Sequence, residues 1–206
     1  VNTYAELMSG RGNDERLAQF WSETVLPEID RLDEMLKNLL RMVEQPDPHV
    51  ESKRVDDLIA QALDVVPMAS ETKDQLFEVS VARDLPSVLV DPVPMRDAIS
   101  YLLAYLAGNR PHQVRVDADI SDKHSERVAV TMTRQSTENS QFDPETLFDP
   151  LAAMQNPDSD LGPVISQKII TNQRGQVEAW CENERVTMRV VLPVSETRAP
   201  SGSEVH

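Results

Sequence analysis

The chain has 206 residues, of which 40% are hydrophobic and 27% charged, as in ordinary soluble globular proteins with a core of their own. Its formal net charge of -15 argues against binding to nucleic acid and against docking on an anionic membrane surface, since both need clusters of Lys and Arg. The single cysteine, Cys181, excludes an internal disulfide, and no apolar run is long enough to span a bilayer. We therefore expect a cytoplasmic protein, with no direct membrane contact from these residues.

The first 46 residues predict two helices joined by a turn. Residues 1–9 are typical of the end of one helix, and a second helix begins near Asn13, after the turn Gly10-Arg11-Gly12. Pro27 should kink this second helix. Because the first helix is short, we expect the amphipathic stripe of the second to pair with another chain rather than to form an intramolecular core. The stripe predicts a homodimer interface formed by Val25, Ile29, Leu32, Leu36, Leu39 and Val43.

A different pattern follows Gln45-Pro46-Asp47-Pro48, which ends the helix and starts a linker. Short strands now alternate with helices. The predicted helices are 55–66, 91–107 and 161–174, the last closed by Gly175. The predicted strands are 76–82, 87–90, 113–120, 127–133, 176–182 and 185–194, with 113–120 and 127–133 as antiparallel neighbours and a polar loop over 134–160.

Several short sequences carry a resemblance that covers residues 1–194. In the hairpin they are Val1-Asn2-Thr3-Tyr4-Ala5-Glu6-Leu7 and Glu28-Ile29-Asp30-Arg31-Leu32, followed by Leu39-Leu40. Further along they are Asp84-Leu85-Pro86 with Asp91 and Arg96, then Leu147-Phe148-Asp149-Pro150, Leu161-Gly162 with Ile165 and Ile169-Ile170, Gly175, and Leu192-Pro193. In order and spacing they resemble the core of sensor histidine kinases, particularly those of the nitrogen-regulator type.

The resemblance implies an α+β fold in four parts. Residues 1–46 would form a dimerisation hairpin, two copies of which make a four-helix bundle. Residues 47–54 would be a linker, and residues 55–194 an α/β sandwich of the histidine kinase ATPase type. We expect the tail, residues 195–206, to be disordered because it has no apolar pattern.

The positions that bind ATP in this family carry other side chains in this sequence. Tyr105 stands where the family has the Asn that holds Mg²⁺, and a phenol is a poor ligand for a hard cation. Arg134 stands where an Asp accepts the adenine amino proton, although Arg has only donors. No glycine occurs between Asn109 and Leu161, so the backbone cannot approach phosphates as closely as the family requires. The resemblance therefore implies a degenerate nucleotide pocket at Tyr105, Arg134, Ser136, Glu138, Asp158, Asp160 and Gly162, with no bound cofactor.

Charge agrees with this interpretation. No Lys or Arg lies between Gln135 and Gln167. The same stretch contains six acidic residues, Glu138, Asp143, Glu145, Asp149, Asp158 and Asp160. Such a loop would repel a triphosphate unless metal ions intervened, although taken alone it could be a solvated acidic loop without a role. The histidines and Cys181 lack metal-ligand spacing, so we expect no metal site and assign no catalytic residue. None of His49, His112, His124 and His206 lies on the hairpin, where the family has its phosphoacceptor.

These observations predict a histidine-kinase-like signalling protein of a two-component system. It would be a pseudokinase or an ATP-independent phosphotransfer or scaffold protein that neither binds nor hydrolyses ATP. Its partners would be a second copy of itself and a response-regulator receiver domain or another kinase. The alternative is an active sensor kinase that binds ATP and magnesium through a divergent site. A third possibility is a binding module unrelated to phosphorelay.

Overall fold

A computed structural model describes residues 25–26, 48–68, 70–108, 112–121, 126–135, 142–155 and 160–195. The chain falls into two compact units, Val1–Gln45 and Pro46–His206. Within the first unit the structure describes only Val25, which is half-buried, and Leu26, which is exposed. The predicted hairpin and most of its dimer stripe, Ile29, Leu32, Leu36, Leu39 and Val43, therefore lie outside the described residues, as does the predicted tail beyond Ser195.

The second unit is built on a five-stranded sheet. Its strands are β2 (Phe77–Val81), β4 (Val114–Ile120), β5 (Arg127–Gln135), β7 (Arg185–Pro193) and β6 (Gln176–Glu182), in the spatial order β2-β4-β5-β7-β6. The pair β2–β4 is parallel and the other three pairs are antiparallel. The antiparallel pairing predicted for 113–120 and 127–133 is confirmed.

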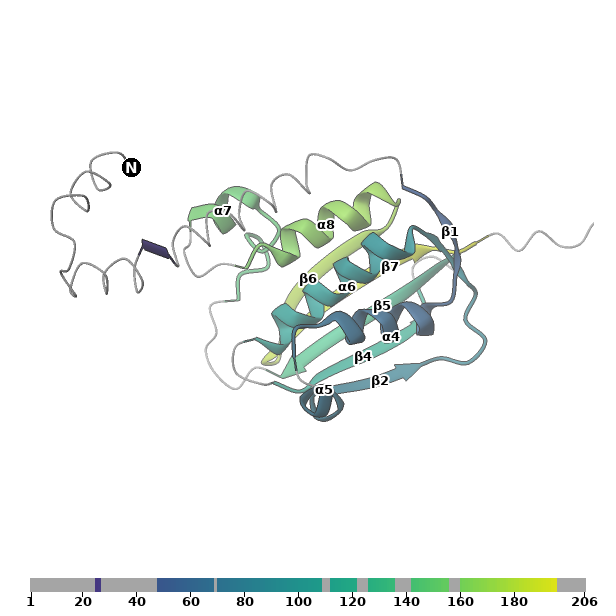
Figure 1. The fold of residues 1–206 in the computed structure, drawn as a ribbon, viewed down its shortest axis with the longest axis horizontal. Helices are drawn as coiled ribbons and strands as arrows, with labels where there is room; N and C mark the ends of the chain where they lie inside the picture. Colours follow the sequence, from purple (N-terminus) through teal and green to yellow (C-terminus); the bar gives the residue numbers. More distant parts are fainter. Residues whose placement is uncertain are drawn as a thin grey trace, which may run out of the picture. The chain divides into compact units, whose positions relative to one another are not determined.

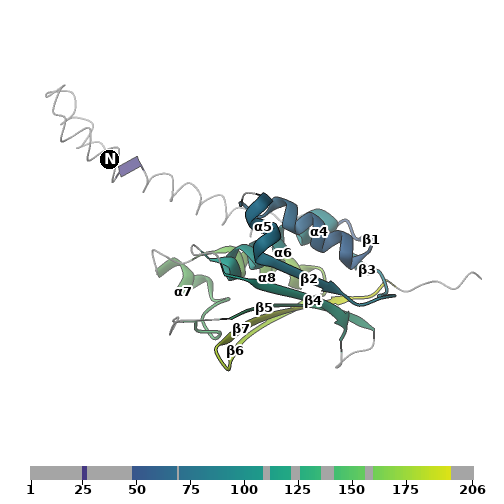
Figure 2. The same cartoon turned by 90° about the horizontal axis from the view of Figure 1, so that it is seen from below.

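Three helices form the second layer. They are α4 (Val55–Val65), α6 (Pro92–Ala107) and α8 (Gly162–Asn172), and they cover one face of the sheet (Figures 1 and 2). The central helix α6 packs against both α4 and α8 and lies on β4 and β5. The predicted α+β sandwich is confirmed.

Alternation along the central strands separates the two faces of the sheet. On the face that the helices cover, Val130 of β5 stands opposite Ala118 of β4 and Val190 of β7. Val128 and Met132, two residues to either side along β5, point the same way, and all five of these side chains are almost fully buried. The core lies between this face and the apolar sides of the helices.

Helices α6 and α8 are joined by buried polar contacts as well as by packing. The Ser166 hydroxyl is fully buried and lies 2.9 Å from the Ala98 carbonyl on α6 and 2.8 Å from the Gly162 carbonyl of its own helix. At the other end of α8, the Gln173 side-chain oxygen accepts a hydrogen bond from the Asp91 backbone N–H over 2.6 Å. Because buried polar groups cost free energy unless they are paired, these contacts fix how the two helices lie together.

Three short elements were not predicted. Residues Glu51–Lys53, placed in the linker, form β1 and pair antiparallel with β3 (Val88–Val90). Ser70–Leu76 forms α5, and Pro150–Gln155, placed in the polar loop, forms α7. Each is too short for an apolar period to repeat, so the sequence pattern gave no signal for them.

Strand β5 also runs to Gln135, two residues past its predicted end. This extension places Arg134 inside the sheet rather than in the polar loop.

Candidate functional site

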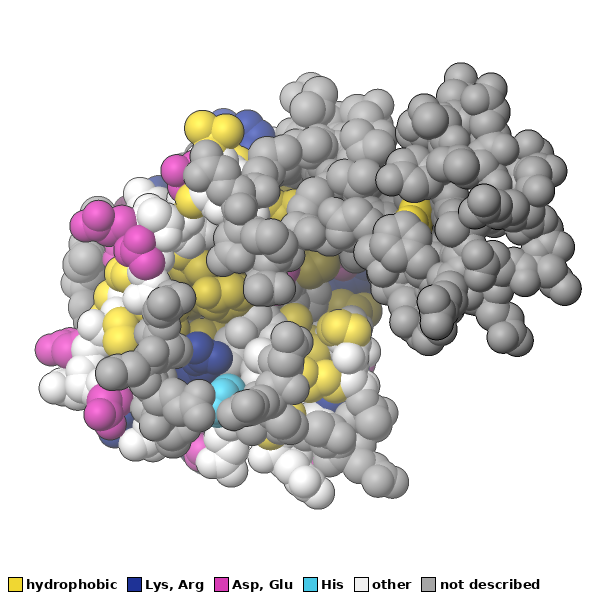
Figure 3. All heavy atoms as spheres, turned by 90° about the vertical axis from the view of Figure 1, so that its left-hand side faces the viewer, with side chains coloured by type: hydrophobic (Ala, Val, Ile, Leu, Met, Phe, Trp, Pro, Cys, Tyr) yellow, Lys and Arg dark blue, Asp and Glu magenta, His cyan; other side chains and the backbone are white. Residues whose placement is uncertain are grey.

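The site predicted from the sequence gathers at one end of the two layers. Tyr105 lies in the last turn of α6, Arg134 is the penultimate residue of β5, and Gly162 is the first residue of α8. Since α6 and β5 both end here and α8 begins here, one end of the domain presents all three (Figure 1). On the surface at that end, hydrophobic side chains gather over the middle of the described region and acidic ones over its margin (Figure 3).

Arg134 continues the inward-facing row of β5. It stands opposite Val114 of β4 and Val186 of β7, two residues beyond Met132, so its side chain leaves the strand on the helix-covered face. Its Nη1 donates a hydrogen bond to the Leu106 carbonyl of α6 over 3.2 Å. The last carbonyls of a helix have no partner within it, and Arg134 supplies one.

The Arg134 guanidinium is not fully satisfied by these contacts. Its Nε is buried and has no hydrogen-bond partner. Val114 and Val186 on the adjacent strands are almost fully buried, as is Leu106 above. A buried donor without an acceptor costs on the order of 1–3 kcal/mol. The Arg134 Nε–H is such an unsatisfied donor.

Tyr105 lies between charges of opposite sign. Burial raises the pKa of its phenol above the ordinary value, the negative charge of Asp160 raises it further, and the positive charge of Arg134 lowers it. The phenol is therefore neutral at physiological pH and can donate as well as accept a hydrogen bond. Arg134 and Asp160, which the sequence also marked as departures from a nucleotide site, therefore both act on the Tyr105 phenol.

Asp160 occupies the position at the start of α8 where an anion would bind. Its Oδ1 accepts a hydrogen bond from the Gly162 backbone N–H over 2.7 Å. Helix N-termini attract phosphate because their first N–H groups are unpaired and lie at the positive end of the helix dipole. At this helix a carboxylate of the chain itself takes one of those N–H groups, and its charge would repel a phosphate.

Gly162 is required by packing as well. A Cβ atom at this position would lie 3.0 Å from Asp160 Oδ1 and 3.2 Å from the Tyr101 Cβ on α6. The one glycine that the family pattern retains in this box thus lets α8 approach α6.

Two carboxylates of the preceding loop have local structural roles. Asp143 accepts hydrogen bonds from the Glu145 backbone N–H over 3.0 Å and from the Thr146 hydroxyl over 2.8 Å. Asp149 accepts one from the Leu151 backbone N–H at the start of α7 over 2.8 Å. Within the described residues, no group of three or more His, Cys, Asp or Glu side chains could hold a metal ion.

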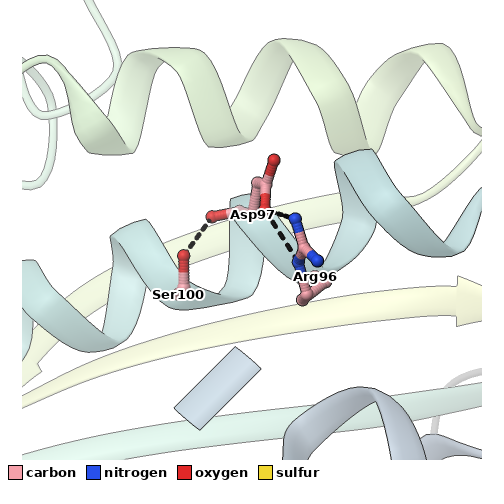
Figure 4. Close-up of polar contacts among 3 residues, drawn as sticks. All are labelled: Arg96, Asp97 and Ser100. Atoms are coloured by element: carbon pink, nitrogen blue, oxygen red, sulfur yellow. Dashed lines mark hydrogen bonds and ion pairs between the residues drawn. The ribbon is translucent and has the colours of Figure 1, made fainter. Parts of the chain in front are cut away.

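Asp91 and Arg96, two of the residues that carry the family resemblance, also form local contacts near the start of α6. The Asp91 carboxylate accepts a hydrogen bond from the His49 backbone N–H over 2.8 Å. Arg96 forms an ion pair with Asp97 at 2.7 Å, and the Ser100 hydroxyl donates to the Asp97 backbone carbonyl over 2.8 Å (Figure 4). The Asp91 carboxylate thus ties the chain before β1 to the start of α6, whereas Arg96, Asp97 and Ser100 contact one another within the helix.

The structure does not place every predicted site residue. Ser136, Glu138 and Asp158 lie outside the described residues. Among the described ones, Arg134 and Asp160 act on Tyr105, and Asp160 contacts Gly162.

A cavity that the sequence did not indicate lies where α4 begins and β2 ends. Its volume is about 370 Å³, and its lining includes two arginines and two aspartates among the residues Arg54, Val55, Asp56, Val81, Ala82, Arg83, Asp84 and Leu85. Arg54 and Asp56 pair with each other at 2.6 Å, which neutralises one charge of each sign. No spacing rule links 54–56 with 81–85, so only the fold could bring them together.

The chain matches no family model. It is 21% identical over 196 residues to the sensor histidine kinase ZraS of Salmonella typhimurium, a match that covers 93% of this chain and 40% of that protein. The chain is a homologue of sensor histidine kinases. It spans about two fifths of the length of the curated relatives it matches.

Solved structures of histidine kinases share its fold. The Acinetobacter baumannii histidine kinase AdeS superimposes with a TM-score of 0.63 at 12% identity, covering 93% of this chain and 91% of that one. The histidine kinase ThkA, solved in complex with the response regulator protein TrrA, superimposes with a TM-score of 0.66 at 14% identity, covering 96% of this chain and 57% of that one. The kinase homologue described here has, in the part that the structure describes, no helix long and apolar enough to cross a membrane.

Proposed function

We propose that this kinase homologue is a pseudokinase of a two-component system, which signals by protein contact or by ATP-independent phosphotransfer. The observation that carries the proposal is the hydrogen bond from the Gly162 N–H to the Asp160 carboxylate. It places a fixed negative charge where a nucleotide phosphate would approach the start of α8.

The base-reading side of the pocket supports the same conclusion. Arg134 projects inward from β5 and offers only donors, which cannot accept the amino protons of adenine. Tyr105, beside it, offers a phenol instead of the oxygen ligands that Mg²⁺ prefers.

The partner we propose is a response-regulator receiver domain, contacted by a homodimer of this chain. The related fold of ThkA was solved together with a response regulator protein, and the amphipathic stripe of the first 46 residues favours pairing of two chains. A receiver domain titrated into the purified protein should give a saturable binding curve.

The second candidate is an active kinase with a divergent site, which the retained Gly162 and the complete two-layer fold favour. Calorimetry with ATP and Mg²⁺ decides between the two candidates. A pseudokinase should release no binding heat up to millimolar nucleotide. Micromolar affinity for ATP would refute the pseudokinase proposal and favour the active kinase. The Asp160→Asn variant tests the reason: if the charge of Asp160 excludes phosphate, neutralising it should raise any residual affinity for ATP, and an unchanged affinity would refute that role.

A further inference from the structure

We propose that the cavity between the start of α4 and the end of β2 binds a small zwitterion with a carboxylate, an ammonium group and a short aliphatic side chain, of which a free aliphatic amino acid is the representative. The cavity has a volume of about 370 Å³, within the range of pockets that bind small molecules. It is separate from the degenerate nucleotide site, so this inference goes beyond the proposed function.

The cavity and the degenerate nucleotide site lie at opposite ends of β2. Arg134 stands opposite Val114 of β4, which in turn pairs with Phe77, the first residue of β2. The cavity is lined by Val81, the last residue of that strand, and by the residues that follow it. The two sites can therefore be tested independently.

Two of the four charged residues in the lining neutralise each other. The Arg54 Nε and Nη2 donate hydrogen bonds to the two Asp56 carboxylate oxygens over 3.0 and 2.6 Å. Such a planar bidentate pair leaves no net charge for a ligand to meet. Recognition of a charged ligand therefore falls to the other two charged residues of the lining, Arg83 and Asp84.

Arg83 and Asp84 are adjacent, opposite in charge and exposed, so a ligand in the cavity can reach both. Within the part of the chain that the structure describes, neither side chain forms an ion pair or a hydrogen bond. The guanidinium offers a fork of donors that fits a carboxylate, and the carboxylate accepts hydrogen bonds from an ammonium group. Because the two residues are consecutive, their ligand should carry its two charges close together, as an amino acid does on one carbon atom.

Charge selects a zwitterion over a ligand with a single charge. The chain has a net charge of -15, which repels a simple anion at long range, and Asp84 repels it within the cavity. A simple cation would instead meet the positive charge of Arg83. A zwitterion pairs with both residues and adds no net charge to the site.

The rest of the lining is apolar and suits an aliphatic side chain. It consists of Val55, which is buried, Val81 and Leu85, which are half-buried, and Ala82. A branched side chain such as that of leucine would remove apolar surface from water against these residues.

The test is a set of parallel titrations of the intact chain with leucine and three analogues, by calorimetry or ligand-observed NMR. Leucine should bind with a submillimolar dissociation constant. Isocaproate lacks the ammonium group and isopentylamine lacks the carboxylate, so each should bind roughly tenfold more weakly, and glycine, without the aliphatic side chain, should also bind more weakly. A dissociation constant for leucine of a millimolar or more, or equal affinity for any of the three analogues, would overturn the proposal.

The two charged residues are tested by Arg83→Met and Asp84→Asn. Asp84 has φ of 61°, a left-handed conformation that Asn also tolerates, so the second variant removes the charge and keeps the backbone. Each variant should lose roughly tenfold in leucine affinity. Arg185→Met and Glu182→Gln are the matched controls, because these exposed residues stand opposite each other beside the β6–β7 turn, and both should bind leucine as the unaltered protein does. Cavity variants that bind leucine as tightly as the controls would contradict the assignment.

Backbone amide NMR identifies where leucine binds. The N–H signals of Arg83 and Asp84 should shift on titration, and that of Gly162 at the start of α8 should stay in place. A shift at Gly162 without one at Arg83 would place leucine in the degenerate nucleotide site and overturn the proposal. Calorimetry with ATP concerns that site alone, so failure of the pseudokinase proposal and failure of this one are distinguishable.

Discussion

Gly175 lies directly against Ile170 at the end of α8. Its N–H donates a hydrogen bond to the Ile170 carbonyl over 2.9 Å, and a Cβ atom in its place would lie 2.7 Å from the Ile170 Cγ2 and 3.0 Å from that same carbonyl oxygen. The sequence predicted that Gly175 closes the helix. In the structure the left-handed residue is its neighbour Arg174, at φ 60°, and the glycine is needed for close approach.

We therefore expect Gly175→Ala to lower the free energy of unfolding by about 1–3 kcal/mol, because the added Cβ would crowd both the Ile170 side chain and the Ile170 carbonyl, and a rotamer change cannot move the carbonyl. Thermal or urea unfolding measures the loss. The exposed Gln176→Ala, one residue later, is the matched control and should change stability by less than about 0.5 kcal/mol. Equal effects of the two substitutions would show that the contact with Ile170 is not tight.

The hairpin between β6 and β7 should be open to stabilisation. Asn183 and Glu184 form its two-residue turn, with φ of 49° and 61°. Turns with two left-handed residues favour Asn at the first position and Gly at the second, and a glutamate in that conformation costs roughly 1 kcal/mol. Glu184→Gly should therefore raise the melting temperature. The control Glu182→Gly places the same substitution at the last residue of β6, where glycine weakens the strand, and should lower the melting temperature.

The long elements of the fold could be predicted from the sequence because their apolar positions repeat. The helix predicted for 91–107 and the strands predicted for 113–120 and 185–194 each match an observed element within a residue at either end. Residues 51–53 could not be predicted as β1 because three residues are too few to show an alternating apolar pattern. Their pairing also depends on Val88–Val90, a partner about forty residues away.

The candidate site was expected from the resemblance, which implied that Tyr105, Arg134 and Gly162 belong to one degenerate nucleotide pocket. In the structure they lie in the last turn of α6, at the penultimate position of β5 and at the first position of α8. The role of Asp160 could not be predicted from the resemblance, because a sequence motif gives the residue type at each position and does not give its hydrogen bond to the Gly162 N–H. The unpartnered Arg134 Nε is likewise a property of packing, set by the apolar strands on either side.

The raised pKa of Tyr105 predicts a specific loss of stability in alkali. Burial disfavours the phenolate in the folded protein, so the folded-state pKa exceeds the unfolded value of about 10. The neutral phenol thus contributes stability that is fully present below about pH 10 and is lost as pH rises through the folded-state pKa. The difference in unfolding free energy between the unaltered protein and Tyr105→Phe should fall over that window. A difference that stays constant with pH would show that Tyr105 is as exposed to water in the folded chain as in the unfolded one.

The predicted dimer stripe is tested by Leu32→Asp. The residue lies outside the described part of the chain, so the expectation rests on the sequence pattern alone. A charge in the middle of an apolar seam should be excluded from the interface and convert the dimer into monomers, as light scattering would show. Lys37→Asp, off the stripe, should leave the mass unchanged. A Leu32→Asp variant that keeps the dimer mass places the interface elsewhere.

Restoring the family's side chain at one position should not restore nucleotide binding. Tyr105→Asn returns the amide that the resemblance assigns to the magnesium ligand, yet it leaves the donor-only Arg134 and the carboxylate of Asp160 over the Gly162 N–H. Calorimetry with ATP and Mg²⁺ should therefore give no binding heat for this variant, as for Tyr105→Phe. The triple variant Tyr105→Asn, Arg134→Asp, Asp160→Gly replaces all three obstacles and should bind more ATP than any single variant. Recovery of binding in Tyr105→Asn alone would mean that the lost magnesium ligand, rather than base reading or charge at α8, keeps the nucleotide out.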